Sequence, residues 1–434
     1  MRALLCALGL TIQALILLAV RSPLAHFPAI YLATFALFCI SVYAAGRVRR
    51  GGWWLIIAFA VSFRVSLLLF PPFLSDDVYR YVWDGRLQTL GINPYSFAPN
   101  SPEIAAYRDE SWPLINNRDI PTIYPPLAQV GFLAAAAAMP EPIALKAAMT
   151  LFDLLCLFML GKLLEMRGES RIHAIVYAWH PLVLFEISSS GHCDPIAIFF
   201  LLLGTATIIR ARSGKSNEAG QALIWLSASF MTKLFPLLFA PFFLTRTPRR
   251  QWLWIFPLPL LLMAIYIRPG SGLFESLRTY ASIWRFNDSV FALAHLVVGD
   301  LQTAKLICGA AVAVATLWAA TRPWRIEDQI MFGLSWFLLL SPQLDPWRLM
   351  WVVPFLVMRM RLSWLVLTGT IVLSYHPLIV QGPYEQWVES GVLKLLEFVP
   401  FVAVLAAESI LRRRRAAADL SSELTRTSTR DPES

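Results

Sequence analysis

The run WWLIIAFAVSFRVSLLLF at residues 53–70 and the segment PPFLSDDVYRYVWDGR at residues 71–86 that follows it decide the fold. The first segment is apolar and has the length of a membrane-spanning helix, which the two prolines at 71 and 72 end. The second segment places two adjacent carboxylates, Asp76 and Asp77, at the membrane–water boundary. Charge is costly there and usually has a function. The sequence therefore predicts a membrane protein with functional carboxylates at its surface.

The composition of the whole chain extends this prediction. Of 434 residues, 57% are hydrophobic and 15% are charged, whereas a soluble protein carries about 25% charged residues. Apolar runs recur along the chain, which predicts an all-α, polytopic integral membrane protein with about 12 transmembrane helices. We expect residues 1–411 to form one transmembrane domain. Residues 412–434 are expected to form a basic, then polar cytoplasmic tail that is disordered.

The distribution of charge predicts which side of the membrane each loop occupies. The formal net charge is +9, and the basic residues cluster in short loops, for example at Arg47, Arg171 and Arg322. This pattern is typical of cytoplasmic loops and argues against nucleic acid as a partner. The acidic loop 71–126 then lies outside the cell, and it is long enough to predict a function. The polar turns 191–195, 341–348 and 381–391 fall on that same outer face.

The helix that follows the two carboxylates carries the first candidate site. Asp77, Arg80, Tyr81 and Asp84 are spaced i, i+3, i+4 and i+7, so they share one helical face. An aspartate beside an aromatic residue suits a general base that removes a proton from a sugar hydroxyl. Asp77 is the preferred base because of its face, and Asp76 is the second candidate. The alternative is that one of the two only caps the helix.

Further substrate contacts are predicted in the same loop. Tyr95, which follows Asn93-Pro94, and Tyr124, which precedes two prolines, offer rigid surfaces for a sugar ring or an isoprenoid chain. A simple turn is the alternative reading of both tripeptides. Arg80, Tyr81, Asp84, Arg86 and Asn93 complete the substrate-binding residues predicted in this loop.

His192 and Asp194 frame a tight turn between two apolar runs. Such a pair can ligate a metal or orient a substrate, or it can simply form an Asp-Pro turn. No third ligand lies nearby in the sequence, and the five cysteines form no CxxC pattern. The sequence therefore predicts no cofactor, and a divalent metal is not indicated.

Two cations in apolar surroundings are candidates for binding a phosphate. Lys233 lies in the middle of the run 221–244, whose halves are each too short to cross a bilayer, so we expect a broken-helix hairpin with Lys233 at its tip. A lysine that reaches the interface without a ligand is the alternative. Arg348 stands beside Trp347 and Asp345, and it could hold a phosphate or only pair with Asp345.

These motifs together resemble those of a known family. Residues 76–86, 91–95, 122–129 and 191–195, with weaker matches at 233–236 and 346–351, are similar to the GT-C superfamily of polytopic glycosyltransferases. Within it the chain most resembles bacterial mannosyltransferases that use polyprenyl-phosphate mannose. The likeness runs from about residue 53 to about residue 400, as judged from these motifs.

The resemblance implies an inverting transfer of a hexose, mannose above all, from a polyprenyl-phosphate donor to a glycan or glycolipid acceptor. It implies that an acidic residue of the first external loop, here Asp77 or Asp76, acts as the base, and that cations stabilise the departing lipid phosphate. The location implied is the bacterial plasma membrane, with the active site on the extracytoplasmic face. A transporter or flippase of a lipid-linked sugar is the rival function.

Overall fold

Helices make up the fold, as the composition predicts. The computed structural model describes residues 1–48, 52–212, 218–267, 272–382 and 388–428. Within these ranges no β-strand forms, and an isolated bridge joins Phe286 to Gln343. The α-helices, in chain order, are α1 Arg2–Ala19, α2 Phe27–Ala45, α3 Gly52–Leu68, α4 Asp77–Thr89, α5 Pro126–Ala138, α6 Pro142–Met166, α7 Ile175–Ala178, α8 Pro181–Val183, α9 Asp194–Arg212, α10 Ala219–Phe230, α11 Ala240–Leu244, α12 Pro257–Tyr266, α13 Leu273–Ile283, α14 Val290–Val298, α15 Leu301–Ala320, α16 Ile326–Leu340, α17 Pro346–Leu349, α18 Val353–Met358, α19 Leu362–Thr370, α20 His376–Gln381 and α21 Gly391–Ser428.

The described residues contain six helical segments that are long and apolar enough to cross a membrane. They are Arg2–Ala19, Leu24–Ala45, Pro142–Met166, Asp194–Ala211, Leu301–Ala320 and Leu362–Gln381. Four shorter apolar segments accompany them: Gly52–Leu68, Pro126–Ala138, Phe235–Leu244 and Pro346–Met358. The chain is therefore a membrane protein with several apolar helices, whereas the predicted count of about 12 crossings is not confirmed.

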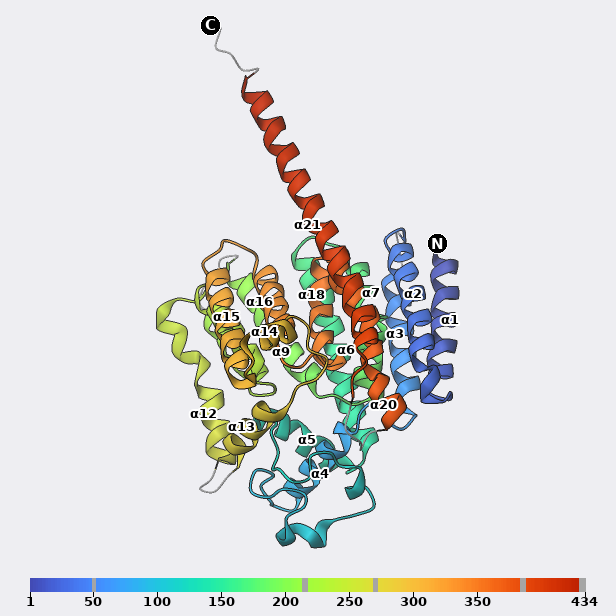
Figure 1. The fold of residues 1–434 in the computed structure, drawn as a ribbon, viewed down its shortest axis with the longest axis vertical. Helices are drawn as coiled ribbons and strands as arrows, with labels where there is room; N and C mark the ends of the chain where they lie inside the picture. Colours follow the sequence, from blue (N-terminus) through green and yellow to red (C-terminus); the bar gives the residue numbers. More distant parts are fainter. Residues whose placement is uncertain (49–51, 213–217, 268–271, 383–387, 429–434) are drawn as a thin grey trace.

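The apolar run 127–139 forms a helix that is short for a membrane crossing. The apolar run 127–139 suggests a span, but α5 has only 13 residues and is therefore about 20 Å long, short of a ~30 Å hydrocarbon core. It packs instead against α4, and both lie beneath the main group of helices in Figure 1. At the contact, a Cβ on Gly85 would come within 2.4 Å of the Phe132 carbonyl oxygen. The absence of a side chain at Gly85 therefore allows α4, which bears the carboxylates, to pack closely against α5.

The hairpin predicted at 221–244 is present. The helix α10 ends at Phe230, and the chain returns through the short helical turn Phe235–Phe239 and α11. Lys233 lies in the turn between the two halves. The segment therefore enters and leaves on one side, as a broken-helix hairpin requires.

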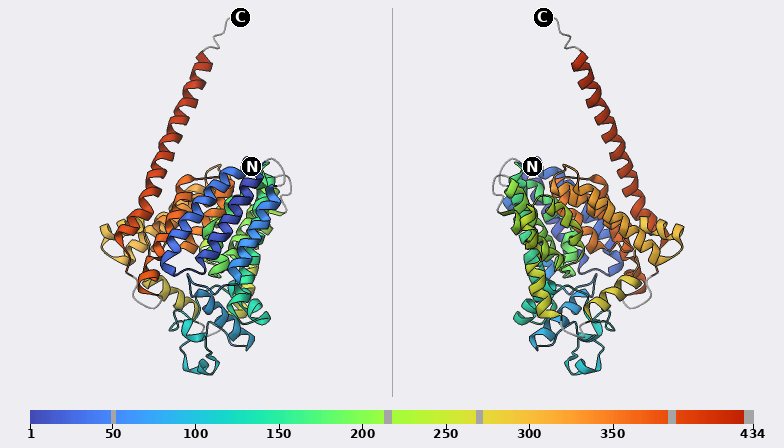
Figure 2. Two further views of the ribbon diagram at one scale, coloured as in Figure 1. Left: turned by 90° about the vertical axis from the view of Figure 1, so that its right-hand side faces the viewer. Right: turned by 90° about the vertical axis from the view of Figure 1, so that its left-hand side faces the viewer.

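Basic loops and polar turns lie at opposite ends of α16. At its first turn, Arg167 pairs with Glu327 and Arg359 pairs with Asp328, both within 2.7 Å. The helix has 15 residues, about 22 Å in length, and it ends immediately before the polar turn 341–348. Both views in Figure 2 likewise show the N-terminus at the end opposite to the α4–α5 region.

The C-terminal tail is helical as far as Ser428. Residues 412–428, expected to be disordered, continue α21, which projects well beyond the other helices in Figure 1. The reason lies in the composition, because the arginines at 412–415 and the alanines at 416–418 are strong helix formers. They extend a helix that is already nucleated, which costs less than starting one. Residues 429–434 lie outside the described residues.

Candidate active site

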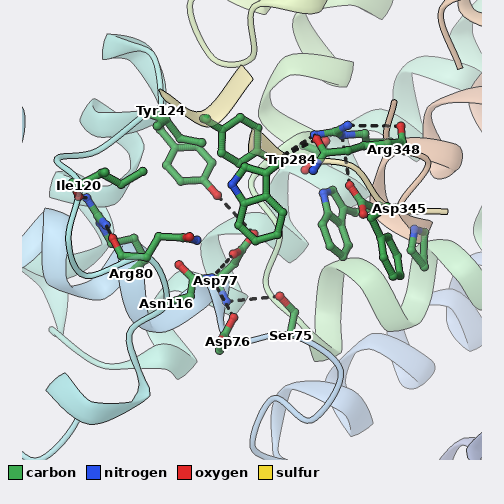
Figure 3. A pocket seen from close by; sticks show the side chains of 18 of the residues that line it. Ser75, Asp76, Asp77, Arg80, Asn116, Ile120, Tyr124, Trp284, Asp345 and Arg348 are labelled. Atoms are coloured by element: carbon green, nitrogen blue, oxygen red, sulfur yellow. Dashed lines mark hydrogen bonds and ion pairs between the residues drawn. The ribbon is translucent and has the colours of Figure 1, made fainter. Parts of the chain in front are cut away.

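A cavity of about 1580 Å³ lies where the loop 71–126 meets the polar turns. Figure 3 shows its interior, with Asp76, Asp77 and Asn116 close together and Arg348 beside Asp345. Eight of the residues predicted from the sequence line this cavity: Asp76, Asp77, Arg80, Tyr124, Asp194, Lys233, Trp347 and Arg348. Val388 and Glu389, from the third polar turn, line it as well, while residues 383–387 of that turn lie outside the described residues. Motifs that are far apart in the sequence therefore meet at one site.

Asp77, the first residue of α4, has contacts with four different side chains. Asn116 donates to its Oδ1 at 2.6 Å, and the hydroxyls of Tyr81 and Tyr124 lie 3.3 and 3.2 Å from its Oδ2. The Nδ1 atom of His192 lies 3.5 Å from the same oxygen. The side chain of Asp77 still keeps 18% of its surface exposed. A carboxylate held from several directions, yet open to a cavity, suits a role in chemistry.

Asp76 occupies the N-cap position of α4, but its side chain makes no capping hydrogen bond. The backbone N–H of Asp77 instead meets the Ser75 hydroxyl at 3.3 Å, and Asp76 accepts a 2.8 Å bond from Asn116. The alternative role of a simple cap is therefore not supported for Asp76. Asn116, which the sequence analysis missed, joins the two carboxylates through its amide group.

The two carboxylates differ in acidity. Burial and the neighbouring charge of Asp77 raise the pKa of Asp76 to about 6. Burial also acts to raise the pKa of Asp77, but His192 and Asn116 outweigh it and lower that pKa to about 2. Asp77 is therefore fully ionised near neutral pH, while Asp76 titrates close to it.

Arg80 and Asp84, predicted as substrate contacts, hold the loop together. Arg80 pairs with Asp84 at 2.9 Å and donates to the carbonyls of Asn117 and Ile120 at 3.2 and 3.1 Å. Asp84 is buried and also accepts a 3.1 Å bond from Gln129. Most donors of Arg80 are thus occupied, so this residue positions the loop even though it touches the cavity.

Three further predicted contacts do not reach the cavity. Arg86 pairs with Asp109 and donates to the Tyr107 carbonyl within the loop. The remaining two, Asn93 and Tyr95, donate to the carbonyls of Tyr266 and Tyr124 at 2.6 Å each. These two bonds fix Tyr124, which does face the cavity, because they tie its segment to α12. The turn alternative is therefore the better description of the Asn93-Pro94-Tyr95 segment.

The turn 191–195 sends its two polar side chains in different directions. His192 is fully buried behind Asp77, stacked on Trp347 with ring centroids 4.6 Å apart, and is not among the residues lining the cavity. Asp194 accepts a 2.7 Å bond from Trp351 and pairs with Lys233 at 3.0 Å. His192 therefore does not have the position of a direct substrate contact that the sequence predicts.

Two of the basic residues that line the cavity, Lys233 and Arg348, are those predicted to bind a phosphate. Lys233 pairs with Asp194 at 3.0 Å, and its ammonium group lies 5.8 Å from the centre of the Tyr124 ring. Arg348 pairs with Asp345 at 3.3 Å, and it also donates to Tyr280 at 3.0 Å and to Gln343. The Asp345 pair predicted for Arg348 is therefore present, while phosphate binding by Arg348 and by Lys233 stays a prediction. Tyr280 and Gln343 were not anticipated from the sequence.

The part of the chain that the structure describes has no cluster of three His, Cys, Asp or Glu side chains that could hold a metal ion. The His192–Asp194 pair in particular points apart, so the metal alternative for this turn is not supported. The site consists of carboxylates, tyrosines and cations around a cavity at one end of a helical membrane protein.

Comparison with known families identifies the class of this membrane protein and its family. Residues 8–248 match the family described as alpha-(1->6)-mannopyranosyltransferase, N-terminal domain. The match covers more than half of the chain, which therefore belongs to this mannosyltransferase family, and the chain is a glycosyltransferase. No curated protein and no solved structure matches the chain.

A glycine beside the site provides a first test of this geometry. Gly191 has φ +81°, and a Cβ there would lie 3.0 Å from Val78 and 3.1 Å from Lys146. We expect Gly191→Ala to destabilise the protein by at least about 1–2 kcal/mol, the cost of left-handed backbone for an L-residue. The control is Gly299→Ala, because Gly299 has φ +78° and nothing within 4 Å. A thermal unfolding midpoint for Gly191→Ala no lower than that of the control would contradict the tight packing behind Asp77.

Proposed function

We propose that the protein transfers a mannosyl group from a polyprenyl-phosphate donor to a glycan or glycolipid acceptor, with inversion at the anomeric carbon. The observation that carries this proposal is that one cavity is lined by an ionised, partly exposed carboxylate, Asp77, and by the ammonium group of Lys233, which pairs with Asp194. The carboxylate can remove the proton of the acceptor hydroxyl, and the ammonium group can stabilise an anionic leaving group.

The proposed reaction assigns a role to each group. Asp77 takes the proton of the acceptor hydroxyl while the hydroxyl oxygen forms a bond to the anomeric carbon. The bond from that carbon to the phosphate oxygen breaks, and its electron pair leaves with the polyprenyl phosphate. Lys233 and Arg348 stabilise the charge that develops on this phosphate. Tyr124 and Trp347, which both line the cavity, offer surfaces on which the sugar ring can stack.

We further propose that the cavity opens on the extracytoplasmic face of a bacterial plasma membrane. The basic loops gather at the opposite end of α16, and loops of this kind remain in the cytoplasm. A lipid-linked donor agrees with this location, because nucleotide sugars are made inside the cell. The proposed topology has about 12 membrane crossings.

The stereochemistry tests the proposal. The family description names an α linkage, and an inverting enzyme makes an α linkage only from a β-linked donor. Purified protein in lipid vesicles should therefore release polyprenyl phosphate from β-linked but not from α-linked polyprenyl-phosphate mannose. Release from the α-linked donor alone would contradict inversion, and use of a nucleotide sugar alone would contradict the donor class.

The pH dependence distinguishes the two candidate bases. If Asp77 is the base, kcat/KM should stay level as the pH falls through 6, because the pKa of Asp77 is about 2 and the carboxylate remains ionised. If Asp76 is the base, kcat/KM should fall tenfold per pH unit below about 6, where Asp76 becomes protonated. We expect the level profile, together with Asp76→Asn activity close to that of the wild type.

A further inference from the structure

Behind Asp77 lies a chain of buried polar groups for which the reaction scheme has no role. It runs from Asp77 through His192 and Glu186 to Tyr375. The Nδ1 atom of His192 lies 3.5 Å from Asp77, and its Nε2 atom lies 3.2 Å from Glu186. The Tyr375 hydroxyl donates to the other oxygen of Glu186. The side chains of His192 and Glu186 are 0% and 1% exposed.

The two neighbouring carboxylates, Asp77 and Glu186, favour the protonated state of His192. Both ring nitrogens face carboxylates, which only accept, and a neutral imidazole can donate from one nitrogen alone. Neither nitrogen makes a hydrogen bond to any described group, the two carboxylates included, but Asp77 and Glu186 both lie within ion-pair distance. A positive charge on the imidazole stabilises both contacts, so the arrangement favours His192 as a cation.

Two features of the local backbone bring these buried side chains together. Glu186 lies in the π-helical turn Leu184–Ser189, a rare local structure that is frequent at functional sites. The left-handed Gly191 then reverses the chain, so that the backbone N–H of His192 bonds to the Glu186 carbonyl at 3.2 Å. Trp347 covers the face of the imidazole ring toward the cavity. The histidine is therefore held between its partners and shielded from substrate.

We propose that Glu186 and Tyr375 are positioning residues, which hold His192 as a buried cation that in turn keeps the Asp77 carboxylate ionised and oriented toward the cavity. The inference rests on the proposed function of Asp77 as the base. Glu186 does not line the cavity, and Tyr375, which does line it, acts in this inference through Glu186 and not through the substrate. Tyr375 fixes Glu186, Glu186 holds the charge of His192, and His192 holds Asp77.

The electrostatics support this geometry. Burial alone lowers the pKa of His192, but the carboxylates of Asp77 and Glu186 outweigh it and raise that pKa to about 9. Asp76 and Asp345 are the other carboxylates that interact with His192, and Lys233 acts on Asp77 from the turn after α10. Removing the charge of Glu186 should therefore lower the pKa of His192 and, through it, raise the pKa of Asp77.

The test uses the full-length protein with isotope-labelled histidine, and NMR follows the protonation of His192, assigned by comparison with His192→Gln. In the wild type, the signal should remain that of an imidazolium through neutral pH. In Glu186→Gln, its titration midpoint should fall by at least about one pH unit, and kcat/KM near neutral pH should fall by at least about tenfold. For Glu186→Gln, kcat/KM should also fall toward acidic pH, while donor affinity should be unchanged.

Tyr375→Phe should lower both the titration midpoint of His192 and kcat/KM, but by less than Glu186→Gln does. The matched control is Tyr31→Phe, because Tyr31 is a buried tyrosine of the same aromatic cluster whose hydroxyl bonds to the Thr368 carbonyl at 2.7 Å instead. This control should leave the His192 titration in place.

An unchanged His192 titration in Glu186→Gln would overturn the inference, even if the wild type transfers mannose. A loss of activity confined to donor affinity would overturn it as well, because it would make Glu186 a substrate contact. If the wild type has no transferase activity, the NMR shift still measures the Glu186–His192 link, and only the role of Asp77 as a base is rejected.

Discussion

Asp77→Asn should reduce the mannosyl transfer rate by about a hundredfold to ten-thousandfold, the range that general-base catalysis contributes. Asparagine has the size of aspartate and can still contact Tyr81 and Tyr124, but its amide oxygen cannot take up the proton of the acceptor. The measurement is the initial rate at saturating donor and acceptor, with purified protein in vesicles. We expect KM for the donor to change little, because Asp77 acts on the acceptor hydroxyl.

The control for this variant removes a different carboxylate from the same cavity. Asp119 lines the cavity, is exposed and bonds to Asn100 in the external loop. Asp119→Asn removes the same negative charge from the cavity as Asp77→Asn does, and it should retain activity close to that of the wild type. Equal losses in the two variants would indicate a general effect of charge and would contradict the assignment of a base. A size-exclusion profile and a thermal midpoint verify that each variant is folded.

Removing the Lys233 cation should produce the second large effect. The single variant would leave Asp194 buried without its partner, and an unpaired buried charge destabilises a protein strongly. The informative protein is therefore the double variant Lys233→Gln with Asp194→Asn, in which both charges disappear together. We expect kcat to fall by about a hundredfold to a thousandfold, the cost of losing one donor to a developing anion.

The matched single variant separates the two roles of the pair. Asp194→Asn alone keeps the ammonium group in the cavity and replaces the carboxylate by an amide that still accepts from Trp351. It should keep most of the activity, although the thermal midpoint should fall. If Asp194→Asn loses as much activity as the double variant, the pair is structural and Lys233 does not contact the phosphate.

Much of the architecture could be predicted from the sequence because membrane insertion leaves strong local signals. Apolar runs, proline boundaries and basic loops predict helices and their sides, and the meeting of three distant polar turns followed from counting crossings. That count is not confirmed at α5, since an apolar helix of 13 residues can bury its surface against α4 as well as in lipid. The tail at 412–428 continues α21 because a polar segment rich in helix formers can extend an existing helix.

The candidate site was predicted in part, and its errors share one cause. Residue type suggests a chemistry but does not say whether a side chain's hydrogen bonds are already used. Arg80, Arg86 and Asn93 have polar groups suited to a sugar, yet their partners are carbonyls and carboxylates of the protein. Asn116 could not have been found, because a single amide in a long loop has no spacing that marks it. Its role is visible only from the two carboxylates it joins.

The most direct test of the central claim follows both products of one reaction in sealed vesicles. Wild-type protein is supplied with polyprenyl-phosphate mannose and a membrane glycolipid acceptor. Mass spectrometry then measures released polyprenyl phosphate and acceptor heavier by one hexose. We expect the two products to form in equal amounts, and both to form at least about a hundredfold more slowly with Asp77→Asn. Movement of intact donor across the bilayer, with neither product formed, would contradict this expectation and identify a transporter of the lipid-linked sugar.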